Sequence, residues 1–148
     1  MKTPVILLAL FLLGGRIHSQ SDSKIRLIDS IVNNIKTKSN LFTKTFKDTA
    51  RLSFSNGASV MEHCYTLKCQ FEKDKPEQLV KVVKEKTVYY YNSNELVKVQ
   101  DNTEIPERLY FWQGQLISSN VSQEKTEFHS RYHLMYAKRF LEKFLTKS

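Results

Sequence analysis

The chain has 148 residues, a formal net charge of +8, a hydrophobic share of 41% and an aromatic share of 11%. A chain of this size forms one domain that can bury a core without metals or disulfides, and its apolar content excludes a disordered protein. Only 4 glycines and 3 prolines exclude collagen-like and low-complexity structures.

The first residues have the pattern of an export signal. Lys2 supplies a positive charge, and residues 4–13 (PVILLALFLL) form an unbroken apolar run that ends at Gly14 and Gly15. This run is too short to span a bilayer and matches the core of a signal peptide. We therefore prefer export to the competing interpretation, a buried N-terminal helix of a cytosolic protein.

The predicted signal divides the chain into residues 1–19, which are removed, and residues 20–148, which form a single domain. Cleavage after Ser19 or after Gln20 fits the polar segment that follows the apolar run. Lys2 and Arg16 lie within the signal, so their removal lowers the formal charge from +8 to +6. The sequence thus predicts an exported protein, either periplasmic or secreted.

A helix is predicted over residues 22–35, and the polar run 33–40 ends it. Its apolar residues are spaced three, four and three apart, which places them on one helical stripe. They are Ile25, Ile28, Val32 and Ile35.

A β-hairpin is predicted next, because Asn56-Gly57 is the preferred pair for a two-residue type I′ turn. The turn fixes a register that sets apolar residues opposite each other on one face and opposite charges on the other. The pairs are Leu52 with Met61, Phe46 with Leu67, and Arg51 with Glu62.

Two cysteines lie in the second strand of this hairpin. Cys64 and Cys69 are five positions apart, so they point to opposite faces, about 17 Å apart and beyond disulfide reach. We expect Cys69 to lie in the core and Cys64 to be free or available to another chain. Two cysteines at this spacing do not make a structural zinc site.

Two further hairpins repeat each other at an offset of 20 residues: residues 90–97 (YYNSNELV) align with residues 110–117 (YFWQGQLI). Asn94 and Gly114 fall at the same place and both tolerate the left-handed conformation, which predicts a three-residue loop in each. The pattern predicts an antiparallel meander.

In that register the meander has two apolar faces. The predicted core face carries Tyr89, Tyr91, Val97, Leu109, Phe111 and Ile117. The second face carries Val88, Tyr90, Leu96, Tyr110 and Leu116, with Lys98 and Arg108 beside them.

The second face gives the candidate binding site. A helix or a loop covers this face, or the face is a docking surface. Large exposed apolar patches are rare on monomers, which favours coverage. Tyrosine, arginine and neighbouring apolar groups are residue types that anchor interfaces. The candidate binding residues are Tyr90, Leu96, Lys98, Arg108, Tyr110 and Leu116.

A second helix is predicted over residues 123–146, with an apolar and aromatic stripe on one side and several basic residues. We expect the stripe to pack on the sheet; the competing interpretation is a helix lying on an anionic membrane surface. The stripe consists of His129, Tyr132, His133, Tyr136, Phe140 and Phe144.

Recognisable chemistry is scarce. His129 and His133 share a helix face at i and i+4 and are the only candidate metal ligands, but a site needs three or four, so we expect no metal and no cofactor. No nucleophile, base and orienting acid occur at a recognisable spacing, and no Gly-rich phosphate loop is present. Scattered basic residues and an export signal argue against nucleic-acid binding. Asn120-Val121-Ser122 is a glycosylation sequon.

The segments Tyr90-Tyr91…Asn94-Glu95-Leu96 and Tyr110-Phe111…Gly114-Gln115-Leu116 resemble small uncharacterised exported bacterial proteins with Tyr/Phe-rich meanders. This resemblance implies no known activity. The order of helix and then meander also resembles cystatin-like folds. The cystatin inhibitory sequence Gln-x-Val-x-Gly is missing, so the resemblance does not imply protease inhibition.

The sequence therefore predicts an α+β fold: an N-terminal helix, an antiparallel sheet of about five to seven strands, and a C-terminal helix. The predicted function is an exported, non-enzymatic binding or interaction domain whose partner is a protein or a small molecule. The alternative is a protein held at the envelope surface by its basic aromatic C-terminal helix. A small secreted hydrolase is the third hypothesis.

Overall fold

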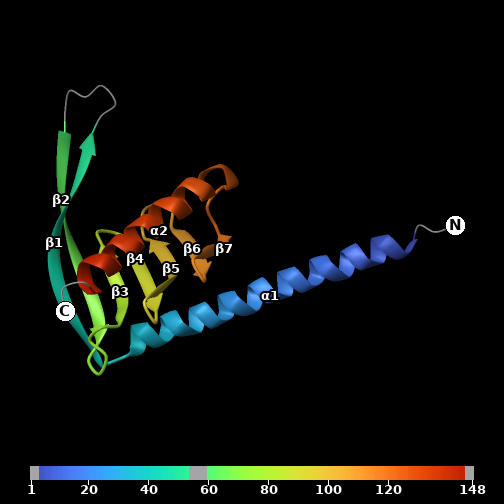
Figure 1. Ribbon diagram of the computed structural model, residues 1–148, viewed down its shortest axis with the longest axis horizontal. Coiled ribbons are helices and arrows are strands. Elements are labelled where there is room, and N and C mark those ends of the chain that lie inside the picture. Colours follow the sequence, from blue (N-terminus) through green and yellow to red (C-terminus); the bar gives the residue numbers. More distant parts are fainter. Residues whose placement is uncertain (1–3, 54–59, 146–148) are drawn as a thin grey trace.

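The computed structural model describes the backbone of residues 4–53 and 60–145 and the side chains of residues 21–50 and 62–145. These residues form an α+β fold in which a seven-stranded antiparallel sheet lies between an N-terminal and a C-terminal helix (Figure 1). The elements are α1 (Pro4–Thr37), β1 (Leu41–Ser53), β2 (Val60–Glu72), β3 (Leu79–Lys84), β4 (Thr87–Asn92), β5 (Glu95–Asp101), β6 (Glu107–Trp112), β7 (Gln115–Ser119) and α2 (Gln123–Leu145). The predicted fold class is confirmed.

The sheet is a simple meander, because the strands lie in chain order from β1 to β7. The β1–β2 hairpin is the longest, and its far end extends beyond the rest of the sheet (Figure 1). Its predicted register is confirmed: Phe46 lies opposite Leu67, and the Arg51–Glu62 and Leu52–Met61 pairs also form. The Asn56-Gly57 turn lies outside the described residues.

Both faces of the sheet are covered by helices. On one face α2 buries Tyr136, Ala137 and Phe140 against the strands. On the other face α1 buries Ile28 and Val32, together with Ile35, and each such side chain contributes roughly 1.5–3 kcal/mol to stability. Of the two interpretations of the second face, coverage and a docking surface, the structure shows coverage, by α1. The run of apolar residues in β4 and β5 follows from this double coverage.

The predicted first helix, residues 22–35, is the part of α1 that packs on the sheet. The backbone of α1 begins earlier, at Pro4, and its N-terminal part extends away from the sheet (Figure 1). Within the residues whose side chains are described, no helix has a stretch both long and apolar enough to span a membrane.

The two repeated hairpins differ from the prediction in their turns. Each has a two-residue loop with both residues at positive φ, as in a type I′ turn: Ser93 and Asn94 at 50° and 64°, and Gln113 and Gly114 at 49° and 73°. The prediction of three-residue loops is therefore wrong. A β-bulge adjoins each turn. In the first hairpin Tyr90 pairs with Lys98 but Tyr91 pairs with Leu96, so β5 has one extra residue, and β7 has one at the equivalent position.

The bulges correct the predicted faces. Beyond each bulge the pairing has the predicted register, but the β5 and β7 residues at the bulge are displaced by one position and lie on the opposite side from the prediction. Leu96 and Leu116 therefore pack toward α2, whereas Val97 and Ile117 pack toward α1. The other assigned residues lie on the faces that the sequence predicts.

The two cysteines lie where the sequence places them. Cys69 is fully buried in the core beneath α2, and Cys64 is exposed on the opposite side of β2, with its Sγ 3.5 Å from the Thr49 hydroxyl. Both are free thiols.

Candidate functional site

Three of the six predicted binding residues lie beneath α1. Tyr90 and Lys98 are only 4% and 7% exposed, and Tyr110 is half-buried. Asp29 of α1 joins the last two: the Lys98 ammonium lies 2.6 Å from its carboxylate, and the Tyr110 hydroxyl donates to the same oxygen at 3.2 Å. These residues attach α1 to β5 and β6.

This attachment keeps a buried lysine charged. Burial lowers the pKa of Lys98, but its hydrogen bonds with Asp29 and Tyr110 outweigh burial, so the pKa lies above the usual lysine value. The ammonium also lies 4.5 Å from the centroid of the Tyr110 ring. The contacts fix the position of α1 and leave this part of the face closed to a partner.

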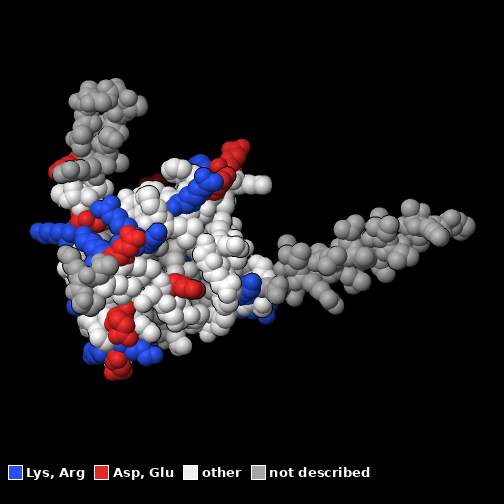
Figure 2. All heavy atoms as spheres, viewed as in Figure 1, with Lys and Arg blue, Asp and Glu red and all other residues white. Residues whose placement is uncertain are grey.

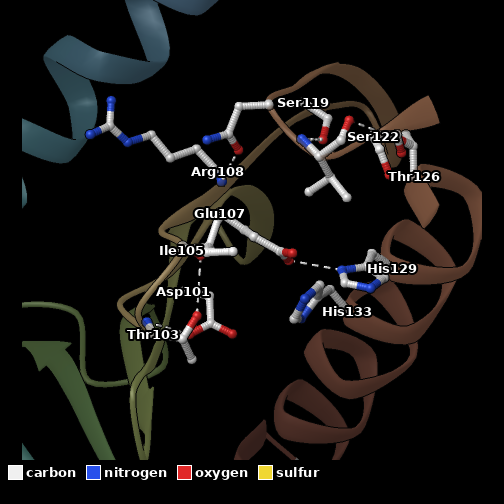
Figure 3. A network of polar contacts seen from close by, with 12 residues as sticks. Asp101, Thr103, Ile105, Glu107, Arg108, Ser119, Ser122, Thr126, His129 and His133 are labelled. Atoms are coloured by element: carbon white, nitrogen blue, oxygen red, sulfur yellow. Dashed lines mark hydrogen bonds and ion pairs between the residues drawn. The ribbon is translucent and has the colours of Figure 1, made fainter. Parts of the chain in front are cut away.

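The other three predicted residues lie elsewhere. Leu96 and Leu116 pack toward α2. Arg108 is exposed, and its backbone N–H donates to the side chain of Asn120, the sequon asparagine (Figure 3). The prediction that all six residues form one surface is wrong, because the bulges divide them between faces and α1 covers half of them.

The structure brings a different set of residues together, around a cavity of about 210 Å³ between α2 and the ends of β3 to β6. We call it the histidine pocket. The sheet side is lined by Lys84, Glu85, Thr87, Asp101 and Glu107. The α2 side is lined by Phe128, His129, Tyr132 and His133.

Strand pairing positions the sheet side of the pocket. Thr87, Asp101 and Glu107 lie opposite one another on β4, β5 and β6, so they form a row across the sheet. Two carboxylates directly opposite each other repel unless a cation or a hydrogen-bond donor lies close to them. The Asp101 carboxylate accepts a hydrogen bond from the backbone N–H of Thr103 at 3.1 Å (Figure 3).

Glu107 and His129 form the polar contact that closes one side of the pocket. His129 Nδ1 lies 2.8 Å from Glu107 Oε2, and both side chains are about three-quarters buried (Figure 3). When His129 is protonated, the contact becomes an ion pair. The carboxylate orients the imidazole ring in either state.

His133 forms the floor of the pocket, one helical turn along α2. Its Nδ1 lies 3.0 Å from the hydroxyl of Tyr89. Burial, with the nearby His129 and Lys84, lowers the pKa of His133 to about 4, so the ring is neutral at neutral pH. Burial likewise raises the pKa of Tyr89.

Phe128 and Tyr132 form an aromatic wall at the mouth of the pocket. Their rings are stacked with centroids 6.2 Å apart and planes at 23°. Burial, the interaction with Tyr136 and the negative charges of Glu85 and Asp101 raise the pKa of Tyr132 to about 12. Glu85 and Asp101 thus lie close enough to disfavour ionisation of the Tyr132 hydroxyl.

The aromatic wall continues as an apolar stripe along the outside of α2. Phe128, Tyr132 and Met135 are 70%, 37% and 58% exposed, and we call these three residues the α2 stripe. Arg131 and Lys138 are exposed beside it. Figure 2 shows Lys and Arg side chains over α2 and the β1–β2 hairpin, with acidic side chains among them.

The predicted stripe of the second helix divides into two parts in the structure. His133, Tyr136 and Phe140 are buried against the sheet, whereas Tyr132 reaches the surface and joins Phe128 and Met135, which lie outside the predicted stripe. A helical wheel that counted all large apolar residues of α2 would have shown that they cover more than one face.

His129 and His133 are not arranged as a metal site. Their ring centroids are 6.4 Å apart, and Glu107 and Tyr89 occupy one nitrogen of each ring. Among the described residues, no group of three or more His, Cys, Asp or Glu side chains could hold a metal ion. The pocket is lined by polar, charged and aromatic side chains together.

The fold and the pocket define an α+β domain with a polar cavity beside an exposed aromatic stripe. Comparison of the chain with protein-family models, with curated proteins and with solved structures gives no significant match.

Proposed function

We propose that the chain is an exported, non-enzymatic binding domain, and that the α2 stripe and the adjoining histidine pocket are its binding surface. The observation that carries this proposal is the exposure of the α2 stripe, in which Phe128 and Met135 are more than half exposed. Export rests on the signal pattern of residues 1–19.

The stripe differs from scattered surface apolar residues because its members adjoin one another and a cavity. Phe128, Tyr132 and Met135 lie four and three positions apart on one helix, so their side chains share one surface. Contiguous exposed apolar patches that are rimmed by polar residues often mark interaction sites, whereas single scattered apolar residues are normal on a surface. Aromatic residues and methionine are also enriched in interfaces.

The first experiment compares two variants. The stripe variant carries Phe128→Ser and Met135→Ser, which remove exposed side chains and spare the buried side of α2. The control carries Leu27→Ser, at an apolar residue of α1 that is 49% exposed and lies on the other side of the sheet. Wild-type and variant proteins are used to capture partners from the exported fraction, and each candidate is purified and titrated by calorimetry.

We expect the stripe variant to bind a purified partner at least tenfold more weakly than wild type, and the control to bind it normally. Unchanged affinity of the stripe variant, or weakening of similar size in both variants, would contradict the proposal. Thermal melts confirm that both variants fold.

A membrane surface is the alternative partner, and the basic residues beside the stripe favour it. Arg131 and Lys138 are exposed on the same helix, as in helices that lie on anionic bilayers. Co-sedimentation with vesicles of anionic phosphatidylserine and of neutral phosphatidylcholine distinguishes the two functions. Binding to anionic vesicles only, weakened by salt and lost in the stripe variant, would establish the alternative.

A further inference from the structure

We infer that the histidine pocket binds an organic ammonium or guanidinium group, carried either by a free amine or by a lysine or arginine side chain of a partner. This inference rests on the proposed function and deepens it, because it names the chemical class that the binding surface takes.

Acidic residues outnumber the lysine at the pocket. Three of them, Glu85, Asp101 and Glu107, line it together with one lysine and two histidines, on a chain whose formal net charge is +8. They come from the β3–β4 turn, the end of β5 and the start of β6. These residues are therefore brought together by the fold and are not neighbours in the sequence. Such an acidic cavity on a basic protein attracts cations locally.

These charges are incompletely neutralised by the described part of the chain. The Lys84 ammonium lies 4.7 Å and 4.3 Å from the ring centroids of Tyr65 and Tyr136, so it interacts with aromatic faces. Among the described residues, the ion-pair partners of Glu85 and Glu107 are histidines, which are charged only when protonated. Asp101 has no cationic side chain within ion-pair distance in the described part of the chain.

The aromatic wall provides an apolar surface beside these charges. Phe128 and Tyr132 stand stacked at the mouth with much of their surface free, and aromatic faces attract organic cations that are partly removed from water. A carboxylate row beneath aromatic faces provides both parts that an alkylammonium group needs: acceptors for its N–H groups and an apolar surface for its carbon chain.

The cavity volume limits the size of the ligand. At about 210 Å³ the pocket is smaller than the sites that enclose drug-sized molecules. It has room for a charged head and a few carbons, which is the end of a lysine side chain or a short alkylamine.

The test is an NMR titration of the full folded domain with butylammonium, with butanol and butyrate as neutral and anionic controls of similar shape. We expect saturable shifts of the His129, Tyr132 and Phe128 ring signals with butylammonium only. The double variant Asp101→Asn, Glu107→Gln keeps the size of both side chains and one acceptor oxygen in each but loses two charges, and we expect its affinity to fall at least tenfold. Glu95→Gln, an exposed carboxylate at the other end of β5, is the matched control and should leave affinity unchanged.

A titration with a lysine-containing peptide separates the two sources of the ammonium group. A peptide that binds more tightly than butylammonium, and loses binding when its lysine is acetylated, identifies a partner chain as the source. Equal affinity for peptide and amine identifies a free amine.

Absence of saturable butylammonium binding, equal binding of butyrate, or full affinity in the double variant would overturn the inference. The proposed function would still stand in those cases if the stripe variant lost its purified partner. Loss of the proposed function would show in that calorimetric comparison and not in this titration.

Discussion

His133 is buried against Tyr89 while it lines a pocket that also contains carboxylates. Burial of the ring opposes its protonation, and the nearby His129 and Lys84 also disfavour a positive charge on the His133 ring. His129, one turn away, faces Glu107 instead. The two histidines on one helix face thus have different environments, because Tyr89 on the sheet contacts His133 and Glu107 contacts His129.

The low pKa of His133 makes stability depend on pH. The unfolded chain takes up a proton at this residue near pH 6.5, whereas the folded chain does so only near pH 4. Stability is therefore highest above pH 6.5 and falls by about 3 kcal/mol as the pH decreases from 6.5 to 4. Urea unfolding at several pH values measures this loss.

His133→Gln should flatten the pH dependence in that range, and His63→Gln, at an exposed histidine, should not. An unchanged slope in His133→Gln would show that other groups cause the acid sensitivity.

At the scale of elements, α1 is held both by apolar packing and by one polar cluster. Ile28 and Val32 pack on the sheet, and Asp29 between them binds Lys98 and Tyr110. The pair contributes less to stability than the apolar contacts, because burial of the Lys98 charge offsets part of the attraction and solvent reaches the Asp29 carboxylate, whose side chain is 43% exposed. The pair defines where along the sheet the helix lies.

Ile28→Ala should therefore lower the free energy of unfolding by about 2–5 kcal/mol, as expected for a fully buried aliphatic side chain. Leu27→Ala, at the adjacent and half-exposed position, should change it by less than about 1 kcal/mol. Denaturant unfolding of the two variants gives both values. Equal effects would mean that α1 does not pack on the sheet through this face.

The sequence predicted most elements because their signals are local. The register of β1 with β2 follows from one Asn-Gly pair and the matching of residues across it, and the stripe of α1 follows from its spacing. The faces of Leu96 and Leu116 could not be predicted, because a one-residue bulge reverses them and leaves no composition signal. The sequence indicated only part of the histidine pocket. The spacing of His129 and His133 places both on one helix face, but Asp101 and Glu107 come close to each other only because β5 pairs with β6 across a loop.

At the scale of the whole molecule, both faces of the sheet are used for the core. Binding is therefore left to the outer sides of the helices, the ends of the strands and the β1–β2 hairpin. The α2 stripe and the histidine pocket occupy two of these places side by side. This arrangement explains why the meander, although richest in tyrosine, is not the surface that we propose for a partner.

The predicted export also concerns the whole molecule. We predict that the mature protein begins at Gln20 or Ser21, which N-terminal sequencing of the exported protein would show. Such cleavage keeps the described contacts of α1, since the Ser21 hydroxyl already donates to the Ile117 carbonyl at 3.4 Å. A cytosolic product that still begins at Met1 would contradict the prediction of export.

The central claim is that the binding surface lies on the outside of α2 and not beneath α1. Two-dimensional NMR of the isotope-labelled domain, titrated with the partner recovered in the capture experiment, tests it most directly. We predict that shift changes concentrate at Phe128, His129, Tyr132 and Met135. Changes centred on Ile28, Tyr90 and Tyr110 would show that α1 moves aside to expose the sheet, and would contradict the account.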